Sequence, residues 1–161
     1  MTAKPVPLPS LRFTIPGPPV PCARARIVVS RSHGRTRAHA FTPEKTASYE
    51  AHVRTLARVA VYQTQGWRTD WGAYSVTLRF YRAERRGDWD NLAKSVTDGL
   101  NGVAYHDDAR IVHALVEVHE DPAQPRAEVV IEMTGSETIE ELQRRLRREV
   151  TASRRASKRL R

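Results

Sequence analysis

Four aspartates and one lysine stand close together in the middle of the sequence, in a pattern that suits metal-assisted chemistry. They are Asp88, Asp90, Lys94, Asp107 and Asp108. Asp88 and Asp90 are two residues apart, so on an extended segment both side chains point to the same side. A third carboxylate from the Asp107–Asp108 pair would complete a set of hard oxygen ligands of the kind that Mg²⁺ prefers. Because carboxylates clustered without a cation would repel one another, the spacing predicts a divalent-metal site.

Lys94 lies one helical turn beyond Asp90 and would point towards the same site. Its ammonium could neutralise the charge that develops on a phosphate group during hydrolysis. Phosphate oxygens would complete the octahedral coordination of Mg²⁺. The arrangement therefore favours hydrolysis of a phosphodiester.

A purely structural interpretation of the same residues is also open. Asp90 would be the N-cap of a helix, and Asp88 would be a loop residue beside the two arginines at 85–86. Lys94 would form a surface ion pair with Asp98, four residues further along the helix. This interpretation explains each residue separately, whereas the metal site explains them together.

The distribution of charge supports a nucleic-acid partner. The net charge is +9 and the sequence pI is near 10.4, in the range of proteins that bind nucleic acid. Residues 1–43 hold seven basic and no acidic side chains, and residues 137–161 hold nine basic and four acidic ones. Residues 44–136 hold eleven basic and fourteen acidic ones, with the aspartates among them. Two basic ends around an acidic middle would hold a phosphate backbone against a metal centre.

Hydrophobic periodicity and turn signals predict the elements that position these residues. In order, they are a strand at 11–15, a basic hairpin with a strand at 27–29 and a turn at 32–34, a helix capped by Thr42 that runs to about residue 63, a strand at 73–82, a helix that begins near Asp90 and ends at Asn101-Gly102, and strands at 110–118 and 126–133. Strands and helices do not alternate strictly. We therefore expect an α+β fold, a single domain with a mixed, largely antiparallel sheet of about four or five strands and two main helices.

The buried faces of the two helices can be predicted from their apolar spacing. They comprise Tyr49, Val53, Leu56 and Ala60 in the first helix, and Leu92, Val96 and Leu100 in the second. We expect one domain at 1–135, followed at 136–161 by a basic, amphipathic to disordered tail.

The single cysteine, Cys22, excludes an internal disulfide and a multi-cysteine zinc site, and it fits a reducing cytoplasm. No run approaches the roughly 20 apolar residues that a membrane-spanning helix needs. We therefore expect a cytoplasmic protein with no membrane partner.

Two stretches, DWDNLAKSVTDGL at 88–100 and YHDDARI at 105–111, closely resemble the RusA-type Holliday junction resolvases. The signature of that family is Asp-x-Asp-Asn-x-x-Lys at a helix start, another Asp four residues on, and an Asp-Asp pair before a strand. Its positions are filled here by Asp88, Asp90, Asn91, Lys94, Asp98, Asp107 and Asp108. The segment FTIPGPPVPCARARI at 13–27 is similar to the opening strand, Pro-Gly turn and paired basic residues of the family. The resemblance covers about residues 11–134.

The resemblance implies a homodimeric endonuclease that depends on Mg²⁺, with Mn²⁺ as a substitute. It would resolve four-way DNA junctions by paired symmetric nicks in recombination and repair, leaving 5′-phosphate ends. The implied catalytic residues are Asp88, Asp90, Lys94 and Asp108. The three aspartates among them would be metal ligands, with Asp107 as a further candidate, and Asn91 and Asp98 would give structural support.

Five arginines of the N-terminal basic segment are expected to bind DNA. They are Arg24, Arg26, Arg31, Arg35 and Arg37. Arg24 and Arg26 occupy the places of the paired basic residues of the family. The segment departs from the family around this pair, because Cys22, Ala23 and Ala25 stand where a lysine, glutamine or proline is often found.

Two other functions remain open at this point. One is a relaxed nuclease that also cuts flaps, D-loops and replication intermediates, and the sequence does not separate it from a resolvase. The other is a non-catalytic protein that binds junctions. The intact Asp88, Asp90, Lys94 and Asp108 argue against the second, because a binding protein would gain affinity for phosphate by losing its acids.

Overall fold

The structure, a computed structural model, describes residues 8–23, 26–32, 35–84 and 88–134. Its main sheet has four strands, whose order across the sheet is β1 (Ser10–Pro16), β6 (Arg126–Met133), β4 (Tyr74–Arg82) and β5 (Ile111–Glu120). β6 pairs antiparallel with β1 and β4, whereas β4 and β5 are parallel. The predicted α+β fold with a mixed, largely antiparallel sheet is therefore confirmed.

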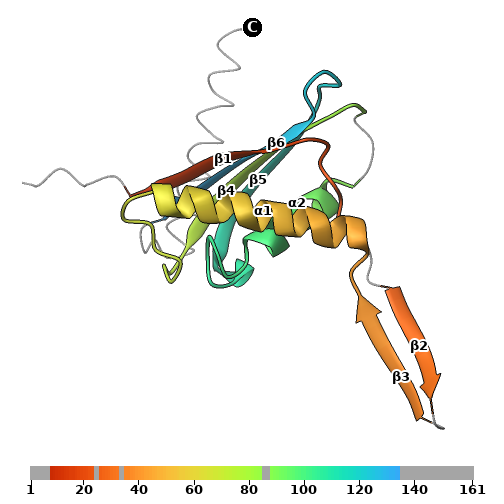
Figure 1. The fold of residues 1–161 in the computed structure, drawn as a ribbon. Coiled ribbons are helices and arrows are strands. Elements are labelled where there is room, and N and C mark those ends of the chain that lie inside the picture. Colours follow the sequence, from red (N-terminus) through yellow and green to blue (C-terminus); the bar gives the residue numbers. More distant parts are fainter. Residues whose placement is uncertain (1–7, 24–25, 33–34, 85–87, 135–161) are drawn as a thin grey trace, which may run out of the picture.

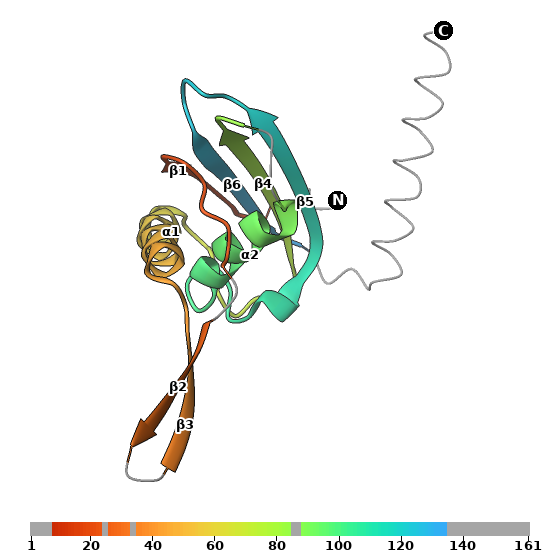
Figure 2. The same ribbon diagram turned by 90° about the vertical axis from the view of Figure 1, so that its right-hand side faces the viewer.

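The parallel pair explains where the second helix lies. Parallel neighbours cannot be joined by a tight turn, so the chain between β4 and β5 must cross over. This crossover carries α2 (Trp89–Leu100) and the short 3-10 helix η1 (Asp108–Arg110). α2 and the longer α1 (Glu44–Gln63) lie on the same face of the sheet (Figures 1 and 2).

The core lies between this face and the helices. In β4 the four alternate residues of the predicted inward face, Tyr74, Val76, Leu78 and Phe80, are all buried. Their partners on β6 are buried too, with Val76 opposite Ile131 and Leu78 opposite Val129. The alternate residues of β4, Ser75, Thr77, Arg79 and Tyr81, are only half-buried on the other face, as expected of a strand with one buried side.

The two helices pack closely against each other. α2 buries Leu92, Val96 and Leu100, as predicted, and a Cβ added at Gly99 would come 2.8 Å from the Cβ of Val53 on α1. In α1 the buried stripe includes Ala57, whereas Leu56, a residue of the predicted buried face, is only half-buried. Small residues are favoured where two helix backbones approach this closely.

The start of α1 differs from the prediction by one residue. Pro43 occupies the N-cap position, and no side chain caps the helix, so the predicted role of Thr42 is wrong. Its C-terminal end at Gln63 agrees with the predicted boundary. At the end of α2, Gly102 has a φ of 73°, which confirms Asn101-Gly102 as the stop signal.

The basic segment forms the predicted hairpin. β2 (Arg26–Ser32) and β3 (Arg35–Phe41) pair antiparallel and are longer than the predicted strand at 27–29. The hairpin projects away from the sheet and the helices in both ribbon views (Figures 1 and 2). The predicted tail at 136–161, and with it the boundary at residue 135, lies outside the described residues.

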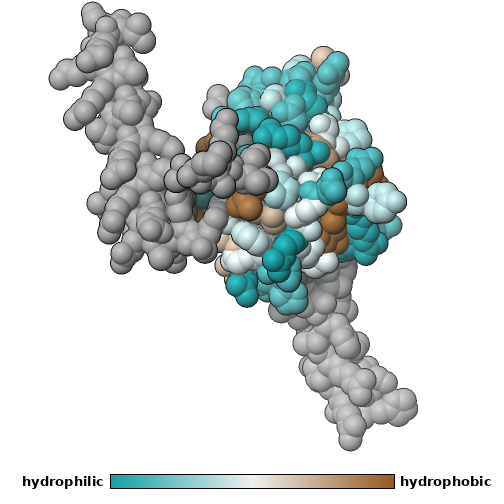
Figure 3. Space-filling model, turned by 90° about the vertical axis from the view of Figure 1, so that its left-hand side faces the viewer, coloured by the Kyte–Doolittle hydropathy of each residue, from teal (hydrophilic) through white to brown (hydrophobic). Residues whose placement is uncertain are grey.

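None of the helices in the described part of the chain is long and apolar enough to cross a membrane. On the face in Figure 3, the described residues are mostly hydrophilic, and the hydrophobic ones form small separate areas.

Candidate active site

The first group of predicted site residues lies at the start of α2. Asp88 has extended backbone angles at the N-cap position, and Asp90 lies in the first turn. The structural interpretation of Asp90 as the N-cap is therefore wrong by two residues. Asp88 does not cap the helix through its side chain either. Instead, its Oδ2 accepts a hydrogen bond of 3.2 Å from Nδ2 of Asn91, which gives Asn91 a role in orienting this carboxylate.

The second group lies at the start of η1, directly before β5. Asp107 Oδ1 accepts a 2.8 Å hydrogen bond from the backbone N–H of Ala109, so Asp107 caps the 3-10 helix. Asp108 is the next residue and is exposed. The two aspartates of the pair therefore differ in their surroundings, since one carboxylate is engaged by the backbone and the other faces solvent.

Lys94 lies between these two groups in the chain, and Asp98 holds its ammonium. Lys94 Nζ is 2.9 Å from Oδ2 and 3.1 Å from Oδ1 of Asp98. This hydrogen bond raises the pKa of Lys94, and the more distant charge of Asp108 acts in the same direction. The predicted ion pair between Lys94 and Asp98 is thus confirmed. The charge of Asp108 also contributes to the electrostatic potential at Lys94.

A group of titratable side chains that the sequence did not predict adjoins this ion pair. The ligand atoms of Cys22, Glu50 and Asp98 lie within 4.8 Å of one another. Burial raises the pKa of Glu50, and the negative charge of Asp98 raises it further. Burial and the charge of Asp98 likewise raise the pKa of the Cys22 thiol. The carboxylates of Glu50 and Asp98 therefore share the ammonium of Lys94, and the thiol of Cys22 lies beside them.

The predicted metal ligands do not form a group as close as this one. In the described part of the chain, Asp88, Asp90 and Asp108 are exposed, and their oxygens do not come together within 4.8 Å as a set of three. None of the three forms an ion pair with a residue that the structure describes. They are hard oxygen donors open to solvent, the class of ligand that Mg²⁺ takes.

The chain that leads into the hairpin is fastened to α2. The backbone N–H of Cys22 donates a 2.8 Å hydrogen bond to the carbonyl of Asn91, and Ser95 Oγ donates one of 2.6 Å to the carbonyl of Val20. Ser95 is fully buried, so this contact is shielded from water. The start of the basic segment therefore lies against the first turns of α2. The side chains of Arg24, Arg26, Arg31, Arg35 and Arg37 are outside the described residues, and their role in DNA binding stays a prediction.

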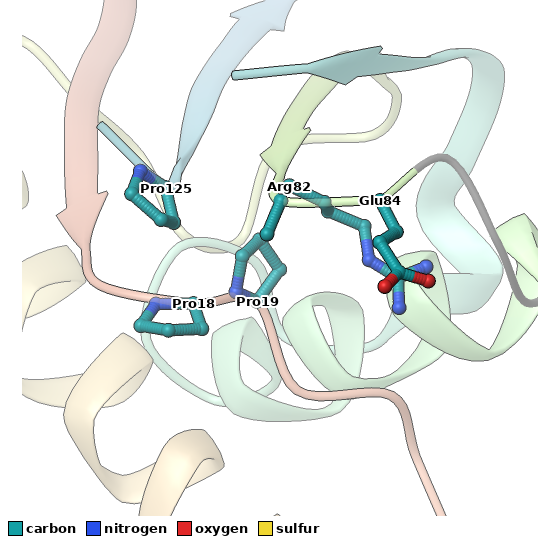
Figure 4. Close-up of a pocket in the computed structure, with 6 residues that line it drawn as sticks. Pro18, Pro19, Arg82, Glu84 and Pro125 are labelled. Carbon is teal, nitrogen blue, oxygen red and sulfur yellow. The ribbon is translucent and has the colours of Figure 1, made fainter. Parts of the chain in front are cut away.

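A hollow of about 310 Å³ lies at the other end of the loop that leads from β4 to α2 (Figure 4). Its walls are formed by Pro18, Pro19, Pro125 and the segment 82–84. No predicted site residue lines it. The predicted metal ligands and Lys94, by contrast, are exposed on the surface.

The chain matches the family model described as endodeoxyribonuclease RusA over residues 16–132. This span includes every predicted catalytic residue and runs from the end of β1 to the penultimate residue of β6. No curated protein matches the chain.

Proposed function

The chain belongs to the RusA family of endodeoxyribonucleases, which act on Holliday junctions, and from this premise we propose that it resolves four-way junctions by paired, Mg²⁺-dependent nicks. The observation that carries the proposal is the set of exposed carboxylates that precede and follow Lys94 in the chain. Asp88 and Asp90 lie at the start of α2, and Asp108 lies at the start of η1.

These three carboxylates would hold Mg²⁺, with Mn²⁺ as a substitute. Their exposure and the absence of ion pairs to other described residues leave their oxygens available to a cation. Asp107 is the weaker candidate, because its Oδ1 caps η1 by accepting the backbone N–H of Ala109, whereas the Oδ2 of Asp88 accepts a longer bond from the side chain of Asn91. When bound, the metal supplies Lewis-acid chemistry that activates water and stabilises the leaving oxygen, which gives 5′-phosphate and 3′-hydroxyl ends.

Lys94 supplies a fixed positive charge at the phosphate. An ordinary lysine is protonated at neutral pH, and the contact with Asp98 raises the pKa of Lys94 further. Asp98 therefore acts as a positioning residue that holds the ammonium on α2, and Asn91 does the same for the carboxylate of Asp88.

The basic hairpin would hold the DNA backbone next to this site. Four of the five predicted DNA-binding arginines, Arg26, Arg31, Arg35 and Arg37, belong to its two strands, which project from the domain (Figure 1). The backbone of Cys22 and Val20 fastens the chain before the hairpin to α2. Phosphate contacts of this kind position DNA without reading its sequence.

A homodimer would place two such sites on one junction. Two coordinated nicks need two active sites, and a pair related by a two-fold axis matches the approximate two-fold symmetry of a four-way junction. We place this activity in DNA recombination and repair in the cytoplasm, where the single cysteine stays reduced.

The test is a nicking assay on a synthetic mobile four-way junction in which each strand is labelled in turn. With Mg²⁺, we expect paired symmetric nicks in the junction and none in a linear duplex of the same sequence, and EDTA should abolish them. Asp90→Asn should reduce nicking by about 100-fold or more while junction binding is kept or improved. Glu132→Gln, which removes an exposed carboxylate that pairs with Arg12, is the matched control and should cut normally.

Two results would change the proposal. Junction binding by the wild-type protein without any cutting would leave a non-catalytic binding protein. Cutting of flaps and D-loops at the same rate as junctions would replace the resolvase with a broader branched-DNA nuclease.

A further inference from the structure

The three tryptophans of the chain lie in very different surroundings. Trp67 Nε1 donates a 2.9 Å hydrogen bond to the carbonyl of Ala104, and Trp71 Nε1 donates one of 2.6 Å to that of Thr134. Both rings also pack against the hydrophobic core. Trp89 is 60% exposed, and no described residue accepts a hydrogen bond from its indole.

Among the described residues, Trp89 belongs neither to the hydrophobic core nor to the partly buried side chains that pack against it. Leu92, Val96 and Leu100 form the buried stripe of α2. Trp89 continues this stripe towards the N-terminus by one turn, beyond the last position that the core covers. A large aromatic ring in water is unfavourable, since aromatic side chains are among those that gain most from burial. An exposed indole at this position is therefore available to a ligand.

The neighbours of Trp89 indicate what kind of ligand it meets. In the sequence it lies between Asp88 and Asp90, both of which are exposed at the start of α2. In the proposed function these two carboxylates hold the metal at a DNA phosphate. The group next to such a phosphate in the substrate is a sugar with its nucleobase. An indole can stack on any base, because every base presents a flat π face.

The branch point is where such a base becomes accessible. In a continuous duplex each base is stacked between its neighbours, so its faces are covered. At a four-way junction whose arms are unstacked, each base pair beside the branch point loses one stacking neighbour, so a base there has a free face. One exposed indole is too little for a platform along a single strand, but it is enough for one base.

We propose that Trp89 is a specificity-determining residue that stacks on a nucleobase exposed at the branch point, so that the adjacent phosphate is brought to Asp88 and Asp90. This inference rests on the proposed function, and it adds a reason why a junction is chosen over a duplex. The contact reads the shape of DNA rather than its sequence.

The experiment measures binding, with Ca²⁺ in place of Mg²⁺ so that cutting does not interfere. Full-length wild type, Trp89→Ala, Trp89→Phe and Trp89→Leu are titrated with a fluorescent four-way junction and with a linear duplex of the same sequence. Trp89→Ala should lose about 5- to 100-fold in junction affinity, the range measured for removal of one base–aromatic stack, with little change for the duplex. Trp89→Phe should restore most of the affinity and Trp89→Leu clearly less, because leucine offers apolar area without an aromatic face.

A direct probe accompanies the titration. With 2-aminopurine at the branch point, binding of the wild-type protein should quench the fluorescence, and Trp89→Ala should not. Tyr62→Ala is the matched control, because Tyr62 is 92% exposed near the end of α1 and is not part of the site. It should bind and quench like the wild type.

Three outcomes would overturn the inference. The first is an equal loss of affinity for junction and duplex, and the second is an unchanged junction affinity in Trp89→Ala. The third is a molecular mass of Trp89→Ala in solution that differs from that of the wild type, because Trp89 would then be a contact between two copies of the chain. Failure of the proposed function gives a different result, since the wild-type protein would then not cut with Mg²⁺ whatever the binding data show.

Discussion

Lys94 Nζ lies 2.9 Å from Oδ2 of Asp98, one turn further along α2. This contact raises the pKa of Lys94, so the ammonium keeps its charge to a higher pH than an isolated lysine would. The same contact fixes where the charge is held. Several consequences of this arrangement and of its surroundings can be measured.

Replacing Asp98 should change the pH dependence of nicking. In Asp98→Asn the pKa of Lys94 falls, so the loss of activity at alkaline pH should begin at a lower pH than in the wild type. We expect kcat to fall by about 10-fold, as for partners that orient a site residue, with KM for the junction little changed. The measurement is a pH–rate profile from neutral to strongly alkaline pH. An alkaline limb at the same pH in both proteins would mean that Lys94 does not control it.

Glu50 should destabilise the folded protein at neutral pH. Its pKa is raised by burial and by Asp98, so the folded state binds the Glu50 proton more tightly than the unfolded state does. The contribution of Glu50 to stability therefore falls as the pH rises from its unfolded pKa to its folded pKa, and it stays low above that window. Glu50→Gln should raise Tm by a few degrees at pH 7.5 and by less at pH 4. Glu44→Gln, in the first turn of the same helix, is the control and should give no such gain. An equal shift at both pH values would contradict the prediction.

Asp107 and Asp108 should behave differently although they are adjacent. Asp108→Asn removes a proposed ligand, and nicking should fall by about 100-fold or more while junction binding persists. Asp107→Asn should keep most of the activity, because asparagine can still accept the N–H of Ala109 at the start of η1. The comparison needs only single-turnover nicking rates for the two variants. If the two rates were reversed, the assignment of the metal ligand would move to Asp107.

The hairpin arginines should contribute affinity without specificity. Replacing Arg31, Arg35 and Arg37 together by alanine should weaken binding to junction and duplex by the same factor. The slope of log affinity against log salt should become shallower by about 0.9 for each DNA phosphate that an arginine no longer neutralises. Titrations at several salt concentrations, with circular dichroism to check folding, measure both quantities. A weakening confined to the junction would instead make the hairpin a reader of branch structure.

The buried faces of single strands and helices could be predicted from local patterns in the sequence. The alternation in β4 and the four-residue spacing in α2 identified the buried faces, because each depends only on neighbours within one element. The boundary of α1 was less accurate, since Thr42 and Pro43 both suit a helix start and only the backbone path decides between them.

The grouping of Cys22, Glu50 and Asp98 could not be predicted in this way. The three come from the segment before β2, from α1 and from α2, so no local spacing relates them. Glu50 and Asp98 are close because α1 packs tightly on α2, which Gly99 allows beside Val53. Cys22 is held beside them by the hydrogen bond from its backbone N–H to the carbonyl of Asn91. The exposure of Trp89 could not be predicted from the sequence either, because its spacing from Leu92 would place it on the buried stripe of α2.

The short connection between β3 and α1 has a mechanical consequence. Only Thr42 and Pro43 separate the end of the hairpin from a helix of 20 residues, and the ring of the proline fixes one of the backbone angles in this joint. On the other side of the hairpin, the N–H of Ala23 is bonded to Thr46 Oγ1, which ties the incoming chain to the first turns of the same helix. In the proposed function, a force that bound DNA exerts on the hairpin would therefore pass through these two connections to α1 and, through the packing of α1 on α2, towards the carboxylates at the start of α2.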